Sequence, residues 1–265
     1  MDRILNTIRF ALWTLVKETG LAVLMKPRLR IWLPARGGLL MQSFLFRSFL
    51  ILSGVLVLVA LVGCDAAGAT VKIPSPVLDD PLAANPGQQT AVFAGGCFWG
   101  IQAVFEHVKG VTTATAGYSG GSVKNPDYEA VSTGETGYAE SVKIVYDPSK
   151  ISFGQLLKVF FSVAHDPTEL NRQGPDTGTQ YRSAIFYANE AQHRIAQAYI
   201  DQLSQARVFP RPIVTQVVAF SSFYPAEAYH QDYAVKHPQD PYIVFNDLPK
   251  IKHLRQQLPD LYQSR

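Results

Sequence analysis

The stretch Gln89–Gly100, QTAVFAGGCFWG, contains the features that decide the fold of this chain. Its first six residues form a short apolar run that favours a buried strand, and residues 98–108 carry apolar side chains at helical spacing. The two glycines before Cys97 permit a tight turn between these elements. The sequence therefore predicts a strand-to-helix unit with Cys97 at the first turn of the helix.

Cys97 is a candidate nucleophile because of this position. The unpaired N–H groups and the positive dipole end at a helix N-terminus favour the thiolate, which is the reactive form of cysteine. The alternative is an inert buried cysteine that packs as a small hydrophobic side chain. The stretch by itself leaves both interpretations open.

Strands and helices alternate through the rest of the chain, and two helix starts carry capping signals. Ser152 with Gln155 has the pattern of a capping box, and Asn189 is a typical N-cap residue. The alternation predicts one α/β (α+β) domain with a mixed sheet. The expected strands span residues 90–94, 111–117, 139–146, 183–188 and 212–220, and the expected helices span residues 98–108, 153–164 and 190–205.

Charge is distributed unevenly along the 265 residues. Residues 1–63 hold eight Lys or Arg and two Asp or Glu, whereas residues 64–265 hold 16 and 19. The basic character therefore belongs to the N-terminal segment. In the rest of the chain Lys and Arg are scattered among acidic residues, which excludes a nucleic-acid-binding stripe.

The N-terminal segment carries the pattern of a bacterial lipoprotein signal. After Met41, an apolar run of 14 residues from Phe49 to Val62 is too short to span a bilayer comfortably. It ends in Leu61-Val62-Gly63-Cys64, which resembles a lipobox with Cys64 as the lipidated residue. We expect residues 1–40 to be an upstream extension, 41–63 a signal peptide, 64–88 a flexible tether and 89–265 the domain, held on the membrane of the bacterial envelope and facing the periplasm or the exterior.

Several polar residues are candidates to assist Cys97. Glu140 shares a strand face with Val142 and Ile144, so it is either a buried carboxyl with a raised pKa or a strand-end residue that bends toward water. Tyrosines of the neighbouring loops, Tyr128 and Tyr181 among them, have hydroxyls that can donate to a ligand oxygen or simply pack. Asp176 lies in the Gly-Pro-Asp-Thr-Gly turn, where Asp often bonds to its own backbone.

The six histidines show no paired spacing typical of a metal site, so we predict no metal centre. A cysteine-dependent acyl hydrolase with His165 or His230 as the base is one alternative function. A lipoprotein binding module with an inert Cys97 is another.

Five separated motifs make the chain from about Thr90 to Leu254 similar to the peptide methionine sulfoxide reductase A family. They are Gly95–Gly100 (GGCFWG), Gly117–Gly121 (GYSGG) with Asn125–Tyr128 (NPDY), Thr136–Glu140 (TGYAE), Asp176–Ser183 (DTGTQYRS) and Phe223–Glu227 (FYPAE). The resemblance implies a two-layer, ferredoxin-like sandwich around a mixed sheet. It also implies an oxidoreductase that repairs the S-epimer of methionine sulfoxide, free or in oxidised proteins, without a bound cofactor.

The resemblance also implies roles for individual residues. Cys97 would attack the sulfoxide sulfur, and Glu140 would protonate the sulfoxide oxygen. Tyr128 and Tyr181 would donate hydrogen bonds to that oxygen, and Asp176 would position a water molecule. Phe98 and Trp99 would form the pocket for the methyl group.

The tail departs from a common pattern of this family. Many members carry a resolving cysteine just after a Pro-Tyr pair, whereas Pro241-Tyr242 is followed here by Ile243 and no cysteine follows Cys97. We therefore expect a one-cysteine enzyme whose sulfenic acid is reduced by an external thiol such as thioredoxin, glutaredoxin or dithiothreitol. We also expect a monomer.

Overall fold

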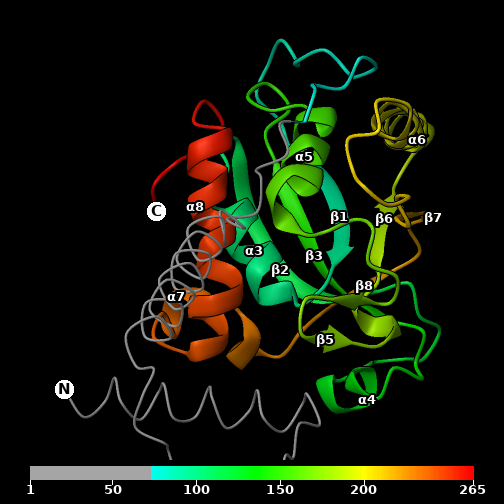
Figure 1. The fold of residues 1–265 in the computed structure, drawn as a ribbon, viewed down its shortest axis with the longest axis vertical. Helices are drawn as coiled ribbons and strands as arrows, with labels where there is room; N and C mark the ends of the chain where they lie inside the picture. The colour runs from blue at the N-terminus through cyan, green and yellow to red at the C-terminus, as the bar shows by residue number, and fades with distance from the viewer. Residues whose placement is uncertain (1–72) are drawn as a thin grey trace, which may run out of the picture. The chain divides into compact units, whose positions relative to one another are not determined.

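Strand β1 (Gln89–Gly95) lies inside a six-stranded sheet with the order β7-β6-β1-β3-β2-β8. The computed structural model in Figure 1 describes residues 73–265. Neighbouring strands are antiparallel except β6 and β7, which are parallel. The predicted mixed sheet is confirmed, and its other strands are β2 (Val111–Ser119), β3 (Ala139–Tyr146), β6 (Ser183–Tyr187), β7 (Gln216–Ala219) and β8 (Phe223–Pro225).

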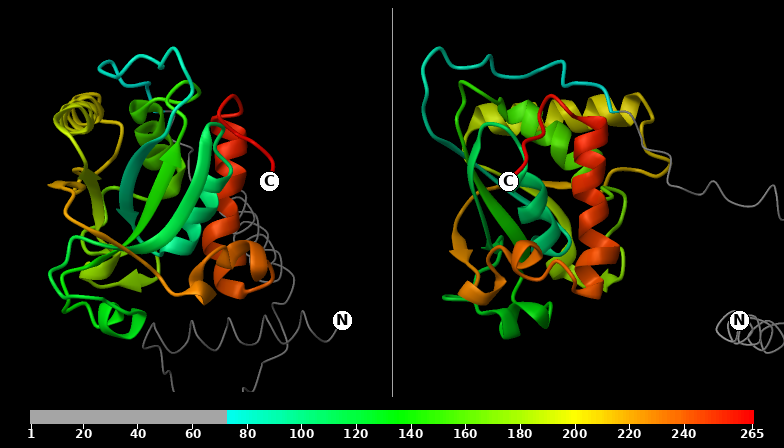
Figure 2. Two further views of the ribbon diagram at one scale, coloured as in Figure 1. Left: turned by 180° about the vertical axis from the view of Figure 1, so that it is seen from behind. Right: turned by 90° about the vertical axis from the view of Figure 1, so that its left-hand side faces the viewer.

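Helices pack on one face of this sheet and give the predicted two-layer arrangement. Phe93 of β1 joins side chains of helices α3, α5 and α6 in the main hydrophobic cluster, whereas its neighbours Val92 and Ala94 join a smaller cluster on the other face. Seen from behind in Figure 2, the sheet lies in front of α3. The helices are α3 (Phe98–Glu106), α4 (Tyr128–Ser132), α5 (Phe153–Val159), α6 (Glu190–Gln205), α7 (Tyr233–Lys236) and α8 (Leu248–Gln257).

The capping signals form the expected bonds. Ser152 and Gln155 make a reciprocal capping box at the start of α5, and the Asn189 side chain accepts from the Gln192 N–H at the start of α6. The helix predicted for 153–164 continues as a π turn over Phe160–Ala164. Short elements complete the fold: the β4 (Arg172–Gln173) and β5 (Asp176–Thr177) ribbon, the 3-10 turns Thr179–Tyr181 and Ala228–His230, and the π turn Ile243–Asp247.

The segment before β1 corrects one boundary. Residues 64–88 were expected to form a flexible tether, but from Ile73 onward the described part is bonded to the domain. Ile73 is 5% exposed in the main cluster, and the Tyr199 hydroxyl donates to the Pro74 carbonyl at 2.7 Å. The Asp79 carboxylate accepts from the Gly154 N–H at 2.8 Å and so satisfies a free donor in the first turn of α5. The amino-acid composition of the segment does not predict this attachment, because it depends on single hydrogen bonds to distant residues.

The predicted signal peptide (41–63) and Cys64 lie outside the described residues. Among residues 73–265, the helices are too short or too polar to cross a bilayer.

Candidate active site

Cys97 is the N-cap residue of α3, at the turn that the sequence predicts. Gly96, which precedes it, has a φ of +96°, a conformation that glycine adopts without strain. A Cβ atom at Gly96 would lie 2.5 Å from the Gln173 side chain. The turn therefore requires glycine for both backbone conformation and space, and it leaves the Cys97 side chain 8% exposed.

Glu140 is buried beside the same helix start. Its side chain is 3% exposed, and its Oε2 accepts a hydrogen bond from the Phe98 N–H at 3.0 Å. Burial raises the pKa of Glu140 to about 8, and the Phe98 N–H opposes part of that rise. Of the two fates left open by the sequence, the structure shows the buried carboxyl, which holds its proton at neutral pH.

The pKa of the Cys97 thiol differs from the prediction, because a position at a helix N-terminus was expected to lower it. Burial raises the pKa of Cys97 well above 9.0, and the nearby Glu140 and Asp247 carboxyls add to the rise. The Trp99 N–H lowers the pKa, as expected at a helix N-terminus, but its effect is smaller than that of burial. The resting thiol is therefore neutral, because desolvation exceeds the effect of the helix end.

Trp99 is fixed by His230 and by two tyrosines, Tyr233 and Tyr242, that the sequence did not mark as site residues. Its ring stacks on Tyr233 with centroids 3.7 Å apart and an angle of 8°, and its Nε1–H donates to His230 Nδ1 at 3.2 Å. Tyr242 meets the same ring edge-on at 5.9 Å. These contacts hold the indole in one orientation beside the thiol.

Three further hydrogen bonds place Tyr128 and Asp176. Glu227 accepts from the backbone N–H of Tyr128 at 2.8 Å and from the Tyr118 hydroxyl at 2.9 Å, which ties the start of α4 to the sheet. The Tyr242 hydroxyl donates to Asp176 Oδ2. Tyr242 and Glu227 were thus missed as functional residues, although each lies in or next to a motif quoted above.

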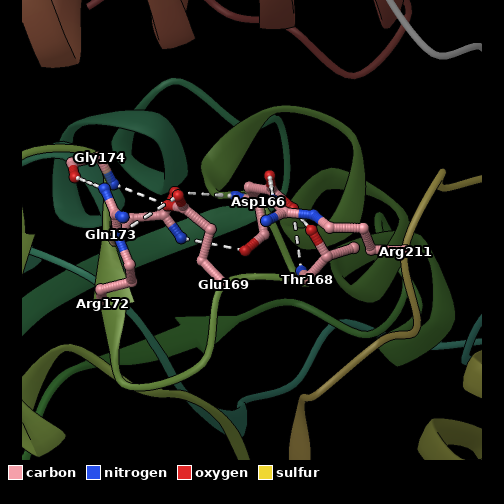
Figure 3. A network of polar contacts seen from close by, with 7 residues as sticks. All are labelled: Asp166, Thr168, Glu169, Arg172, Gln173, Gly174 and Arg211. Carbon is pink, nitrogen blue, oxygen red and sulfur yellow. Dashed lines mark hydrogen bonds and ion pairs between the residues drawn. The ribbon is translucent and has the colours of Figure 1, made fainter.

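The loop that carries Asp176 and Tyr181 is held by a polar network (Figure 3). The side-chain amide of Gln173 donates to the Asp166 carbonyl and accepts from the Asp166 N–H, each at 3.0 Å. Glu169 accepts from the Gly174 N–H at 2.7 Å, and Arg211 pairs with Asp166 at 3.1 Å. Because Gln173 also lies against Gly96, the network sets the loop directly beside the nucleophile turn.

All seven predicted site residues of the domain line one cavity of about 180 Å³. It opens beside the thiol and brings together residues from α3, β3, the start of α4 and the β5 loop. Tyr242 is the additional member. The lining residues are Cys97, Phe98, Trp99, Tyr128, Glu140, Asp176, Tyr181 and Tyr242.

The histidines do not serve the thiol as a base. His165 bonds through Nε2 to Ser183 Oγ at 2.7 Å and through Nδ1 to the Phe160 carbonyl at 3.1 Å, and burial lowers its pKa to about 4. His230 accepts from Trp99 through Nδ1. Both are packing residues here, so the cysteine–histidine hydrolase interpretation is wrong. Within residues 73–265, no three His, Cys, Asp or Glu side chains are grouped to hold a metal ion.

A neutral thiol and a protonated carboxyl share one aromatic cavity, a combination that suits an enzyme with a cysteine nucleophile and a carboxylic acid. Comparison with known proteins gives the family. The family model described as "Peptide methionine sulfoxide reductase" matches residues 89–261. The chain is 60% identical over 182 residues to peptide methionine sulfoxide reductase MsrA 2 of Mesorhizobium japonicum, covering 69% of this chain and 93% of that protein. The chain belongs to the peptide methionine sulfoxide reductase family and is an oxidoreductase that reduces methionine sulfoxide.

Other relatives agree in sequence and in fold. MsrA 2 of Synechocystis is 53% identical over 195 residues, covering 73% of this chain and 91% of that protein. The reduced form of Mxr1 from Saccharomyces cerevisiae matches with a TM-score of 0.53 at 30% identity, covering 60% of this chain and 94% of that one. Methionine sulfoxide reductase A of Corynebacterium diphtheriae gives 0.51 at 35% identity, with coverages of 66% and 91%.

Proposed function

We propose that the chain reduces the S-epimer of methionine sulfoxide, free and in oxidised proteins, with Cys97 as nucleophile and Glu140 as general acid. The observation that carries this proposal is the 180 Å³ cavity, in which the Cys97 thiol lies beside a carboxyl whose pKa is about 8. A sulfoxide oxygen leaves readily only when it is protonated, and Glu140 is protonated at neutral pH.

The balanced first step converts the thiol and the sulfoxide into a sulfenic acid and a thioether. The Cys97 sulfur bonds to the sulfoxide sulfur while that sulfur's oxygen accepts a proton from Glu140. The bond between the substrate sulfur and its oxygen breaks, an S–O bond forms at the Cys97 sulfur, and the bond between the two sulfur atoms breaks. The substrate sulfur gains two electrons, the Cys97 sulfur loses two, and the thiol proton restores the Glu140 carboxyl.

The other lining residues have roles that fit their chemistry. The hydroxyls of Tyr128 and Tyr181 donate to the sulfoxide oxygen as negative charge develops on it. Asp176, held by Tyr242, positions a water molecule in the cavity. Phe98 and Trp99 supply the apolar wall that contacts the methyl group.

Recycling uses a thiol from outside the chain. Cys64 and Cys97 are the two cysteines of the sequence, and Cys64 is the residue we expect to carry lipid. Two external thiol groups, supplied by a thioredoxin-like or glutaredoxin-like protein or by dithiothreitol, reduce the sulfenic acid to the thiol and release one water and one disulfide.

The enzymatic assignment is tested with the two epimers of N-acetylmethionine sulfoxide and dithiothreitol. Wild type should reduce the S-epimer and spare the R-epimer, whereas Cys97→Ser should abolish turnover and retain the fold, because a hydroxyl is a far weaker nucleophile at neutral pH. Cys64→Ser is the matched control and should retain turnover in detergent. Activity in Cys97→Ser would overturn the assignment.

The lipid anchor places this activity at the bacterial cell envelope. It rests on the apolar run that ends at Leu61-Val62-Gly63-Cys64. Intact mass of protein taken from bacterial membranes should show a chain that begins at Cys64 and carries added lipid, and Cys64→Ser should lose both features. A product that keeps its leader would contradict this location.

A further inference from the structure

An ion pair from the C-terminal part of the chain lies against the first turn of α3, behind the Cys97 turn. Lys250 Nζ is 3.1 Å from Asp247 Oδ1. A Cβ atom at Gly100, the third residue of α3, would lie 2.1 Å from Asp247 Oδ1 and 2.7 Å from Lys250 Nζ. The close approach of both charged groups therefore depends on glycine at that position.

Asp247 is unusual among the carboxyls of the described chain. Its side chain is 0% exposed, and its Oδ2 has no hydrogen-bond partner among residues 73–265. Burial raises the pKa of Asp247, and Lys250 opposes the rise. The Lys250 side chain is 18% exposed, so its ammonium is largely withdrawn from water. Burying two charges is costly, which makes a gain in structural stability a weak explanation for the pair.

The first turn of α3 has few donors for the acidic groups around it. The Phe98 N–H donates to Glu140, and the backbone N–H of Trp99 lowers the pKa of Cys97 by less than burial raises it. Asp247 is a third acidic group at the same helix end. Lys250 places an ammonium at this helix end and lowers the pKa of Cys97, although by less than Asp247 raises it.

We propose that Lys250, held by Asp247 against the first turn of α3, is a positioning residue that supplies the positive charge stabilising the Cys97 thiolate when it forms. Asp247 balances that ammonium, so the pair adds no net charge beside the first turn of α3. When the Cys97 thiolate forms, the ammonium of Lys250 is close to it, and the Asp247 carboxylate is already paired with that ammonium. The proposal rests on the assignment of Cys97 as the nucleophile.

Other groups that face the thiol must be considered in any test by pH. They come from β3, from the start of α4, from the β5 loop and from the tail. They are Glu140, Tyr128, Asp176, Tyr181, Tyr233 and Tyr242, together with Asp247 and Lys250 themselves. None of the substitutions below changes the first six groups. Differences in the alkylation profile between variants therefore measure the effect of the Asp247–Lys250 pair on the thiol.

The test measures the rate of Cys97 alkylation by iodoacetamide from pH 6 to pH 10 in a full chain that carries Cys64→Ser. Lys250→Met should raise the apparent thiol pKa and slow alkylation at pH 8 by ~3–10-fold, because ten-fold in thiolate corresponds to one pH unit. This requires Asp247 to remain ionised without Lys250, so the shift is read at the alkaline end of the range. A protonated Asp247 would leave the net charge of the pair unchanged, as in the double variant below. Asp247→Asn should shift the thiol pKa in the opposite direction.

The double variant Asp247→Asn/Lys250→Met should alkylate within about twofold of wild type, because no net charge is removed. Lys252→Met, on the exposed side of α8, is the matched control and should leave the profile unchanged. A purely structural pair predicts a different pattern, in which both single variants and the double variant loosen the site and expose the thiol to faster alkylation. That pattern, or an unchanged profile in folded Lys250→Met, would overturn the proposal.

Sulfoxide turnover by the same proteins separates this inference from the proposed function. Active Cys97→Ser would refute the role of the thiol and leave the alkylation shifts to be measured independently. If Cys97→Ser is inactive and Lys250→Met alkylates as wild type does, the function stands and the role of Lys250 falls.

Discussion

Glu140→Gln should make the protein more stable and nearly inactive. In the folded protein burial raises the pKa of Glu140 from 4.5 to about 8. Between these two values the carboxyl is protonated when folded and ionised when unfolded. The folded state then binds more protons, so stability falls as pH rises through this window and is fully retained only below pH 4.5.

The size of the effect follows from the two pKa values. A difference of about 3.5 pH units at 1.36 kcal/mol each gives a destabilisation on the order of 5 kcal/mol above pH 8, and about 3 kcal/mol at pH 7. Gln has no carboxyl to ionise, and its amide oxygen can still accept from the Phe98 N–H. Glu140→Gln should therefore gain a few kcal/mol in the free energy of unfolding at neutral pH while turnover falls ~100–10,000-fold for want of the acid.

The assay is urea unfolding of wild type and variant, followed by circular dichroism at several pH values from 4.5 to 8, with turnover measured on the same samples. Glu135→Gln, an exposed loop residue, is the matched control and should change neither quantity. An equally steep pH dependence in Glu140→Gln would show that the buried carboxyl is ionised in the folded state. A loss of turnover below threefold would assign the proton to another donor.

Three other perturbations probe the surroundings of the site. Tyr242→Phe removes the donor to Asp176 and should lower kcat by about tenfold to a hundredfold, given the worth of a hydrogen bond to a charged group, whereas an unchanged kcat would remove Tyr242 from the mechanism. Asp79→Ala removes an acceptor at the first turn of α5 and should cost about 1 kcal/mol in urea unfolding with turnover unchanged; no loss would show that the segment before β1 is only loosely attached. After one turnover without reductant, Cys97 should react with dimedone as a sulfenic acid, and nonreducing mass analysis should find no disulfide within the processed chain.

Local patterns were sufficient for most of the fold. The glycine turn before Cys97, the Ser152 capping box and the Asn189 cap each depend on neighbouring residues, and each is present. The elements missed by the sequence analysis are short: α4 has five residues, β8 three and β5 two. Such segments have too few residues for a hydrophobic period, and tertiary bonds fix them instead, as Glu227 fixes the start of α4.

The candidate site was predictable in its membership and not in its electrostatics. Motifs near Cys97, Tyr128, Glu140 and Asp176 lie far apart in sequence and meet around one cavity. The pKa of the Cys97 thiol depends on its burial and on Asp247, which is distant in sequence. A prediction based only on the position at a helix N-terminus includes neither effect. Tyr242, Asp247 and Lys250 all belong to the tail, where no regular pattern relates them to the thiol.

The neutral resting thiol suits a chain that carries no second cysteine after Cys97. A thiolate exposed at a helix end reacts with oxidants and alkylating agents whether or not substrate is bound, and its sulfenic acid can proceed to the irreversible sulfinic form. Burial keeps Cys97 protonated at rest, and in the proposed mechanism the thiol reacts only once a sulfoxide that can take up the Glu140 proton enters the cavity. Reactivity is then tied to the presence of an acceptor oxygen, and the hazard of a one-cysteine cycle is confined to the interval between turnover and the arrival of the external thiol.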